Sequence, residues 1–347
     1  MVFFSTASMR GLLLASLLAV TLLTSMAGSS PASAASGDPT RPERFAAARS
    51  WGYQLQNVDP KRLAEAPYDV LVIDYLSYKE DAPLTAAEVQ AMQRVPDGRR
   101  RIVLAYMSIG EAETYRYYWE WKWGGSWLGS VLSLIYAPAW LGGENAEWGG
   151  NYAVRYWEDG WQRIILGNGG YLDRIVAAGF DGVYLDKVDA SIERITKGRP
   201  TAKDDMRNFV ARIAERGRRL SPGFLIVPQN GEELLDSPAY VALIDGLAKE
   251  DLLFGEFKNG VANPPDVIAR RTAMLAPLLA ARKPILAVEY IDDANVIRVA
   301  RETLTALGCV PHFAHRDLAA MRFTDTPDAA GSSERKSRRR WFRSASN

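Results

Sequence analysis

The chain has 347 residues, of which 48% are hydrophobic, and a formal net charge of +1. This length suits one large domain or two small ones with a full hydrophobic core. The near-neutral charge argues against a general nucleic-acid binder, because the basic face of such a protein normally shows in the total charge.

The first 34 residues are predicted to form a secretory signal peptide. An apolar run from Gly11 to Leu23 follows the single charged residue Arg10, and small residues at 32–34 suit cleavage. The alternative is an uncleaved membrane anchor, but the run is shorter than the ~20 residues that a spanning helix needs. We therefore expect a secreted or periplasmic protein with no stable membrane span once mature, and a linker over residues 35–45.

The cysteine and histidine counts exclude several kinds of site. The single cysteine, Cys309, cannot form an intrachain disulfide, which in an exported protein suggests a bacterial source. The two histidines, His312 and His315, are too few with one cysteine for a typical structural zinc site. No glycine-rich phosphate loop follows a predicted strand. We expect neither a metal nor an organic cofactor.

Eight short apolar segments alternate with longer segments of helical periodicity. The predicted strands cover residues 51–55, 70–74, 102–107, 182–186, 224–227, 243–248, 285–290 and 309–313. Their continuous apolarity is typical of parallel strands covered on both faces. Helical spacing follows most of them, with a capping box at Thr85 and Glu88 and a plausible C-terminal glycine at Gly308.

This alternation predicts a single (β/α)8 TIM barrel over residues 46–325, with an open doubly wound sheet as the alternative. An aromatic-rich insertion is expected after the third strand, because eight of the ten tryptophans lie between Trp119 and Trp161. Such rings could stack on sugars, or could fill a local core of their own. Residues 326–347 are polar and basic and are predicted to be a disordered tail.

Carboxylates and amides follow several predicted strands, where the active site of a barrel lies. Asp186 ends the predicted fourth strand, and Glu250 follows the predicted sixth strand. Aspartates there often cap the next helix, as Asp189, Asp292 and Asp293 could, but glutamate is a weaker cap. Two carboxylates at one mouth suit glycoside hydrolysis, in which one protonates the leaving oxygen and the other acts as nucleophile or base.

The stretches "LAYMSIGEAE", "GFDGVYLDKVDA" and "PQNGEELL" resemble glycoside hydrolase family 114, the endo-α-1,4-polygalactosaminidase-like barrels. The resemblance covers most of residues 51–315. It implies hydrolysis of α-1,4-linked galactosamine or related amino-sugar polysaccharides, with Asp186 and Glu250 as catalytic acids and Glu289 as a substitute for Glu250. Expected substrate contacts are Asp74, Tyr106, Glu111, Tyr184, Gln229, Asn230, Glu289 and Tyr290.

Three functions therefore remain open from the sequence. The first is an exported endo-acting glycosidase whose polysaccharide substrate carries ammonium groups, since acids outnumber bases around the predicted mouth. The second is a carbohydrate-binding barrel of the envelope or matrix that performs no catalysis. The third is a barrel glycosidase that acts on small glycosides.

Overall fold

The computed structural model describes residues 39–77 and 82–322. The predicted signal peptide and the predicted basic tail lie outside these residues. No helix in the described part of the chain is long and apolar enough to cross a bilayer.

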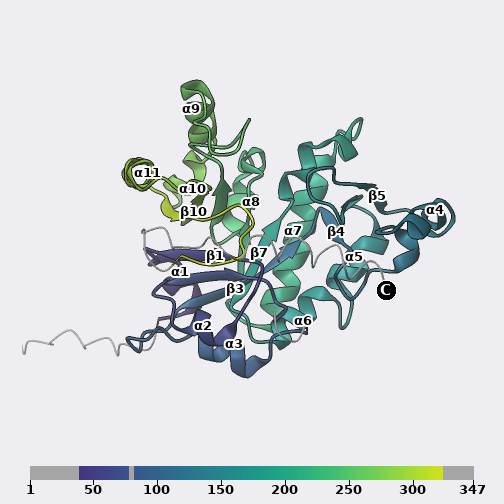
Figure 1. The fold of residues 1–347 in the computed structure, drawn as a ribbon, viewed down its shortest axis with the longest axis horizontal. Helices are drawn as coiled ribbons and strands as arrows, with labels where there is room; N and C mark the ends of the chain where they lie inside the picture. The colour runs from purple at the N-terminus through teal and green to yellow at the C-terminus, as the bar shows by residue number, and fades with distance from the viewer. Residues whose placement is uncertain (1–38, 78–81, 323–347) are drawn as a thin grey trace, which may run out of the picture. The chain divides into compact units, whose positions relative to one another are not determined.

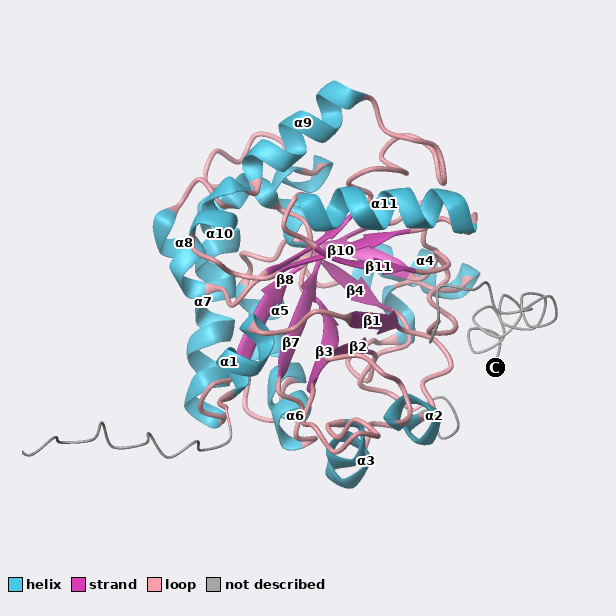
Figure 2. Cartoon of the chain, turned by 90° about the vertical axis from the view of Figure 1, so that its left-hand side faces the viewer, coloured by secondary structure: helices cyan, strands magenta, loops and turns pink. Residues whose placement is uncertain are grey.

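The described residues include eight parallel strands that follow the predicted order. They are β1 Trp51–Gln54, β2 Val70–Ile73, β3 Ile102–Ser108, β7 Gly182–Asp186, β8 Leu225–Pro228, β9 Leu247–Glu250, β10 Ile285–Glu289 and β11 Val310–Phe313. Five of them pair in the order β1–β2–β3–β7–β8, and three in the order β9–β10–β11. Figures 1 and 2 show these strands with helices along their outer side.

Further contacts join the edge strands of the two groups, β8 to β9 and β1 to β11. A parallel bridge between Gln229 and Ala248 links β8 to β9. Between β1 and β11, the indole N–H of Trp51 donates to the carbonyl of Val310 at 2.9 Å, and the backbone N–H of Tyr53 approaches Nε2 of His312 at 3.3 Å. The protein therefore has an α/β fold with a parallel sheet, consistent with a TIM barrel.

Alternate residues of the strands form two separate cores. One core contains Trp51 and Tyr53 of β1, Tyr184 of β7 and alternate residues of the other parallel strands. No described residue of the long helices that follow β7 and β10 belongs to it. The intervening strand residues, such as Val183 and Leu185, pack in a larger core with the helices. This alternation places the first set on the inner face of the sheet and the second on its outer face.

The described helices that cover the strands are α1 Arg41–Ala46, α2 Pro60–Ala64, α3 Ala86–Met92, α5 Asp159–Leu166, α6 Tyr171–Ala177, α7 Ala202–Leu220, α8 Pro238–Leu243, α9 Pro265–Met274, α10 Ala276–Ala280 and α11 Ala294–Ala306. Among them, α1, α2, α3, α8 and α11 begin at a residue whose side chain caps them. The capping box of Thr85 and Glu88 is confirmed at the start of α3. Gly308 follows α11 with φ of 83°, as a C-terminal glycine requires.

A linker was predicted over residues 35–45, but residues 41–45 lie in helix α1. Thr40 caps it with a capping box, and Phe45 is buried among the inner-face residues. Nε of Arg41 also donates to the buried carboxylate of Asp181 at 2.8 Å. Residues 39–45, the part of this segment that the structure describes, therefore belong to the folded unit, because a buried aromatic ring and a partly buried ion pair attach them to the sheet.

The connection between β3 and β7 has its own structure. Strands β4 Glu111–Glu113, β5 Leu141–Glu144 and β6 Asn151–Val154 form an antiparallel sheet in the order β4–β6–β5. The 3-10 helix η1 Trp121–Trp123 and helix α4 Trp127–Tyr136 lie between β4 and β5. These elements are short and rich in glycine and aromatic residues, so their hydrophobic pattern did not identify them.

Many of the tryptophans in this connection pack on one another. The ring of Trp123 lies 5.3 Å from that of Trp140, which in turn lies 5.1 Å from that of Trp161. All three are buried, whereas Trp127 is 82% exposed. Part of the aromatic cluster is therefore a local core, and part faces solvent.

Candidate active site

Asp186 is the last residue of β7 and lies on the inner-face side of that strand, since it follows the inward-facing Tyr184 by two positions. The hydroxyl of Tyr106 donates to its Oδ2 at 2.6 Å, and the backbone N–H of Lys187 donates to its Oδ1 at 2.7 Å. Lys187 adopts a left-handed backbone conformation with φ of 60°. The backbone turn after β7 thus holds the carboxylate against the end of the strand.

Glu250 is the last residue of β9 and follows the inward-facing Ala248 by two positions. The hydroxyl of Tyr290 donates to its Oε1, and Nδ2 of Asn230 lies 3.4 Å from its Oε2. Asn230 in turn accepts from the backbone N–H of Glu250 at 3.2 Å and from Nζ of Lys249 at 3.1 Å. Each carboxylate therefore has one tyrosine hydroxyl and additional fixed contacts.

Burial raises the pKa of both Asp186 and Glu250, and the charge of Glu250 also acts on Asp186. Burial, followed by the negative charge of Glu250, raises the pKa of Asp186 to about 7. Burial also raises the pKa of Glu250, while the hydroxyl of Tyr290 opposes this rise. A pair of this kind shares one proton near neutral pH. One carboxyl group can then act as the acid while the other, ionised, acts as nucleophile or base.

Inward-facing aromatic residues lie next to the pair. Tyr53 and Tyr184 contact each other with ring centroids 5.1 Å apart. The hydroxyl of Tyr53 donates to Oε1 of Gln229 at 3.4 Å. The negative charges of Glu250 and Asp186 act on both tyrosines and contribute to their raised pKa values. Of the predicted contacts, Tyr106 therefore binds Asp186, Asn230 and Tyr290 bind Glu250, and Tyr184 and Gln229 contact Tyr53.

Glu111 belongs to a second group of charges beside Asp186. Its Oε1 accepts from Nδ2 of Asn145 at 2.9 Å and lies 3.6 Å from Nζ of Lys187, which also pairs with Glu193. Asp189 is in the 3-10 helix η2 Val188–Ile192, where it makes no capping hydrogen bond. Burial, opposed chiefly by the positive charge of Lys187, raises the pKa of Asp189 to about 7.

Asp74 directly follows β2 and is held by a buried arginine. Nη1 and Nη2 of Arg116 each lie 2.8 Å from one of its carboxylate oxygens, and Nε of Arg116 donates to Glu113 at 2.7 Å. The guanidinium carbon of Arg116 also lies 4.6 Å from the centroid of the Tyr115 ring. The structure therefore places Asp74 in an ion-pair cluster, with both oxygens already occupied.

Glu289 lies on the opposite side of the sheet from Asp186 and Glu250. It has 0% exposure, and its oxygens accept from the backbone N–H groups of Leu253 and Phe254 at 2.8 and 3.1 Å. Burial raises its pKa to about 8. It follows the outward-facing Ala287 by two positions, so it lies on the helix side of the strand. The carboxylate fastens the loop after β9 and is closed to solvent in this structure.

The sequence analysis missed several residues of this site. Tyr53 lies two positions after Trp51 on β1, so both side chains face inward. The alternation of side chains along a strand could have revealed this. Arg316 lies 2.7 Å from Asp251 and 4.2 Å from the ring centroid of Tyr290, yet no local pattern marks it. The expected capping role of Asp293 at α11 is confirmed, whereas Asp189 caps no helix.

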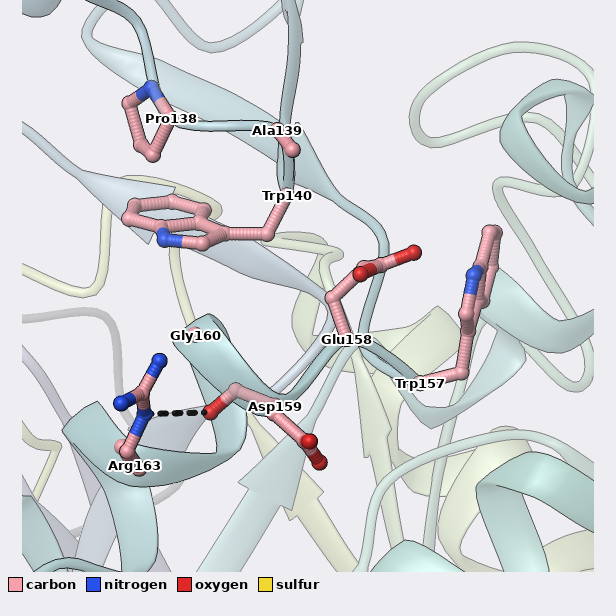
Figure 3. A pocket seen from close by; sticks show the side chains of 8 residues that line it. All are labelled: Pro138, Ala139, Trp140, Trp157, Glu158, Asp159, Gly160 and Arg163. Atoms are coloured by element: carbon pink, nitrogen blue, oxygen red, sulfur yellow. Dashed lines mark hydrogen bonds between the residues drawn. The ribbon is translucent and has the colours of Figure 1, made fainter.

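A hollow of about 520 Å³ lies away from these carboxylates, at the start of α5 (Figure 3). Its lining residues include Trp140, Trp157, Glu158, Asp159 and Arg163. Asp159 opens α5, where a carboxylate is favoured by the helix dipole. The hollow contains no residue of the predicted site.

The chain is similar to proteins from several other organisms. The chain is 34% identical over 286 residues to an uncharacterized protein of Deinococcus radiodurans, which covers 81% of this chain and 84% of that protein. It is 37% identical over 254 residues to an uncharacterized protein of Methanocaldococcus jannaschii, which covers 71% of this chain and 67% of that protein.

Among solved structures, the glycoside hydrolase domain of PelA from Pseudomonas aeruginosa has a similar fold. The TM-score is 0.58 at 17% identity, and the match covers 79% of this chain and 97% of that domain. The model of the glycoside-hydrolase family GH114 matches residues 29–334. The chain therefore belongs to family GH114 and is a glycoside hydrolase.

Proposed function

We propose that this glycoside hydrolase is exported and cleaves within amino-sugar polysaccharides, with Asp186 and Glu250 as its catalytic pair. One carboxyl group protonates the oxygen of the leaving sugar. The other attacks the anomeric carbon or activates a water that does so. The α-1,4-galactosamine linkage comes from the family resemblance.

One observation carries this proposal. Asp186 and Glu250 end two separate strands on their inner-face side, and each is held by a tyrosine hydroxyl. Both remain partly accessible to solvent, whereas Glu289 is fully buried. Asp186 and Glu250 therefore combine raised pKa values with access to a ligand, which argues for Glu250 over Glu289 in the catalytic role.

The charge near the pair supports an ammonium-bearing substrate, although less broadly than the sequence suggests. Arg116 neutralises Asp74, and Arg316 pairs with Asp251. Asp186 and Glu250 have hydrogen-bond partners but no ion pair within 4.0 Å among the described residues. Negative charge is thus concentrated at the catalytic pair, where it would attract a deacetylated amino sugar.

The test uses Asp186→Asn and Glu250→Gln on a partly deacetylated α-1,4-galactosamine polymer. Each change should lower the rate of new reducing ends by roughly 10²–10⁴-fold, because acid–base catalysis is lost while the shape is kept. Glu215→Gln, at a 74% exposed side chain, serves as the matched control. Full activity in either test variant removes that residue from the catalytic role.

The products and binding separate the proposal from the other two functions. An endo-acting enzyme shortens the polymer quickly, before monosaccharide accumulates. Release of monosaccharide from short glycosides, with polymers untouched, indicates a glycosidase of small substrates. Saturable polymer binding with no new reducing ends in the unmodified protein indicates a binding barrel.

A further inference from the structure

Helix α4, Trp127–Tyr136, exposes an unusual amount of apolar surface. The exposed fractions of Trp127, Leu134 and Ile135 are 82%, 86% and 76%, and Leu128 is half exposed. The sequence from 124 to 143 contains no charged residue. Single exposed apolar side chains are ordinary, but a contiguous group of them marks a contact surface. In Figure 1 this helix lies at the far right, well away from β1 and β3.

The helix is attached to the protein by its backbone and not by its large side chains. Gly129 is the buried residue of α4, and a Cβ atom added there would lie 2.4 Å from the carbonyl oxygen of Trp121. This close approach fixes α4 against η1. Except for the partly buried Leu132, the large side chains are consequently left at the surface, and Trp121 adds its own 62% exposed ring.

The chemistry of this surface favours lipid over sugar. The hydroxyl of Ser130 donates to the carbonyl of Ser126 at 2.9 Å, and that of Ser133 to the carbonyl of Ser130 at 2.8 Å. Both hydroxyls are therefore used within the helix. A sugar-binding surface needs polar groups beside its aromatic rings, and here aliphatic side chains take their place.

The length and the aromatic ends of α4 suit the surface of a bilayer. Ten residues span about 15 Å, which is too short to cross the hydrocarbon core. Trp127 and Tyr136 stand at the two ends of the helix, and tryptophan and tyrosine are enriched at the boundary between headgroups and acyl chains.

The sequence also supplies a second, electrostatic signal. Residues 335–343 read "RKSRRRWFR" and so combine six basic residues with two aromatic ones. Such a segment complements anionic headgroups. Stable attachment to a membrane surface generally needs two weak signals of this kind together.

We propose that α4 and Trp121 insert into the interface of a lipid bilayer with anionic headgroups, and that residues 335–343 add the electrostatic attraction. This contact holds the hydrolase at a membrane surface and involves none of the residues around Asp186 and Glu250. It is independent of the proposed substrate.

The test places an environment-sensitive dye on α4 in the full chain. Leu134→Cys is labelled with nitrobenzoxadiazole, and Glu215→Cys, also strongly exposed, carries the same dye as the matched control. The native Cys309 is buried, and burial raises the pKa of its thiol to about 12, so it reacts slowly with the dye. Vesicles of phosphatidylglycerol and phosphatidylcholine should shift the emission of the Leu134 probe to the blue, and leave the control probe unchanged.

Unlabelled variants test the two signals separately by vesicle flotation. Trp127→Ser combined with Leu134→Ser and Ile135→Ser should lower binding at least about tenfold. Arg338→Ser with Arg339→Ser and Arg340→Ser should lower binding to anionic vesicles only. Every variant keeps residues 1–38, so a membrane anchor there cannot explain a difference between them. An unchanged unfolding transition confirms that the surface variants fold.

Three results overturn the proposal. The first is a Leu134 probe that does not respond to any vesicle. The second is a blue shift without vesicles that grows with protein concentration, which indicates a second copy of the chain as the partner. The third is a shift caused by polysaccharide and not by vesicles, which indicates a sugar-binding surface. Equal binding to anionic and neutral vesicles overturns the electrostatic part.

Discussion

Substitution of Tyr106 should change the pKa of Asp186 while the carboxyl group itself is kept. Its hydroxyl donates to Asp186, and this hydrogen bond opposes the upward shift caused by burial and by Glu250. Tyr106→Phe should therefore raise the pKa of Asp186 further above about 7. The limb of the pH–rate profile that reports Asp186 should move to higher pH, whether the residue acts protonated or ionised.

The measurement is kcat/KM against pH for Tyr106→Phe and for a matched tyrosine. Tyr240 is suitable, because it lies in α8 and its hydroxyl is buried without a hydrogen bond in the described structure. Tyr240→Phe should leave both limbs in place. A Tyr106→Phe profile with unmoved limbs would show that Asp186 does not control the rate.

Arg116 has a different role, because its charge is enclosed by protein. The side chain has 0% exposure and faces Asp74 and Glu113, which are 9% and 1% exposed. Arg116→Met should lower the free energy of unfolding by roughly 3–5 kcal/mol, since two buried carboxylates then lose their counter-ion. Chemical denaturation measures this value.

An exposed arginine gives the comparison for Arg116. Arg298 pairs with Glu302 on α11 at about two-thirds exposure of both side chains, so Arg298→Met should cost less than about 1 kcal/mol. Equal losses for the two arginine variants would contradict the structural role of the buried cluster.

The location of a single residue relative to the sheet can be read from the sequence where the alternation along a strand is visible. Asp186 and Glu250 each lie two positions after an inward-facing residue, and both reach the inner side. Glu289 follows the outward-facing Ala287 by two positions, so its separate location was also encoded in the sequence. The partnership of Asp74 with Arg116 was not, because it joins residues 42 positions apart through a loop.

At the level of elements, β7 and β8 approach each other closely at Gly182. A Cβ atom added there would lie 2.4 Å from the carbonyl oxygen of Leu225 and 2.5 Å from its Cβ. Backbone atoms cannot move away as a flexible side chain can. Gly182→Ala should therefore destabilise the protein by about 1–3 kcal/mol, and thermal or chemical unfolding measures this loss.

The control for Gly182 is Gly149→Ala. A Cβ atom at Gly149 would meet nothing within 4 Å, so its unfolding should change little. Because β7 also ends in Asp186, Gly182→Ala should lower activity along with stability. A fully stable Gly182→Ala variant would contradict the close pairing of these two strands.

The elements were predictable to the extent that local signals determined them. The pattern of eight strands and the capping box at Thr85 were visible in the sequence. The sixth strand, however, was predicted at residues 243–248 and begins later in the structure. Residues 238–243 form α8, because Ser237 caps a helix that opens with Pro238, so β9 begins only at Leu247. Two stretches of helical periodicity, residues 160–180 and 265–283, each correspond to two helices in the structure. Gly167 ends α5 before α6, and Leu275 separates α9 from α10.

On the scale of the whole molecule, the net charge of +1 conceals an uneven distribution. Positive charge is dense in the sequence at residues 335–343, while Asp186 and Glu250 concentrate negative charge at the strand ends. A polymer that carries ammonium groups is attracted to the second region. That attraction weakens as salt shortens the Debye length from ~30 Å at 0.01 M to ~10 Å at 0.1 M.

The proposed substrate therefore predicts a salt-dependent kcat/KM. For partly deacetylated galactosamine polymer, kcat/KM should fall severalfold between these two salt concentrations, mostly through a higher KM, because screening acts on binding before the chemical step. The same polymer after full N-acetylation has lost its ammonium groups, and its kcat/KM should stay nearly constant. The acetylated polymer also reports any effect of salt on the enzyme itself. A parallel decline for both polymers would show that substrate charge is not what this site recognises.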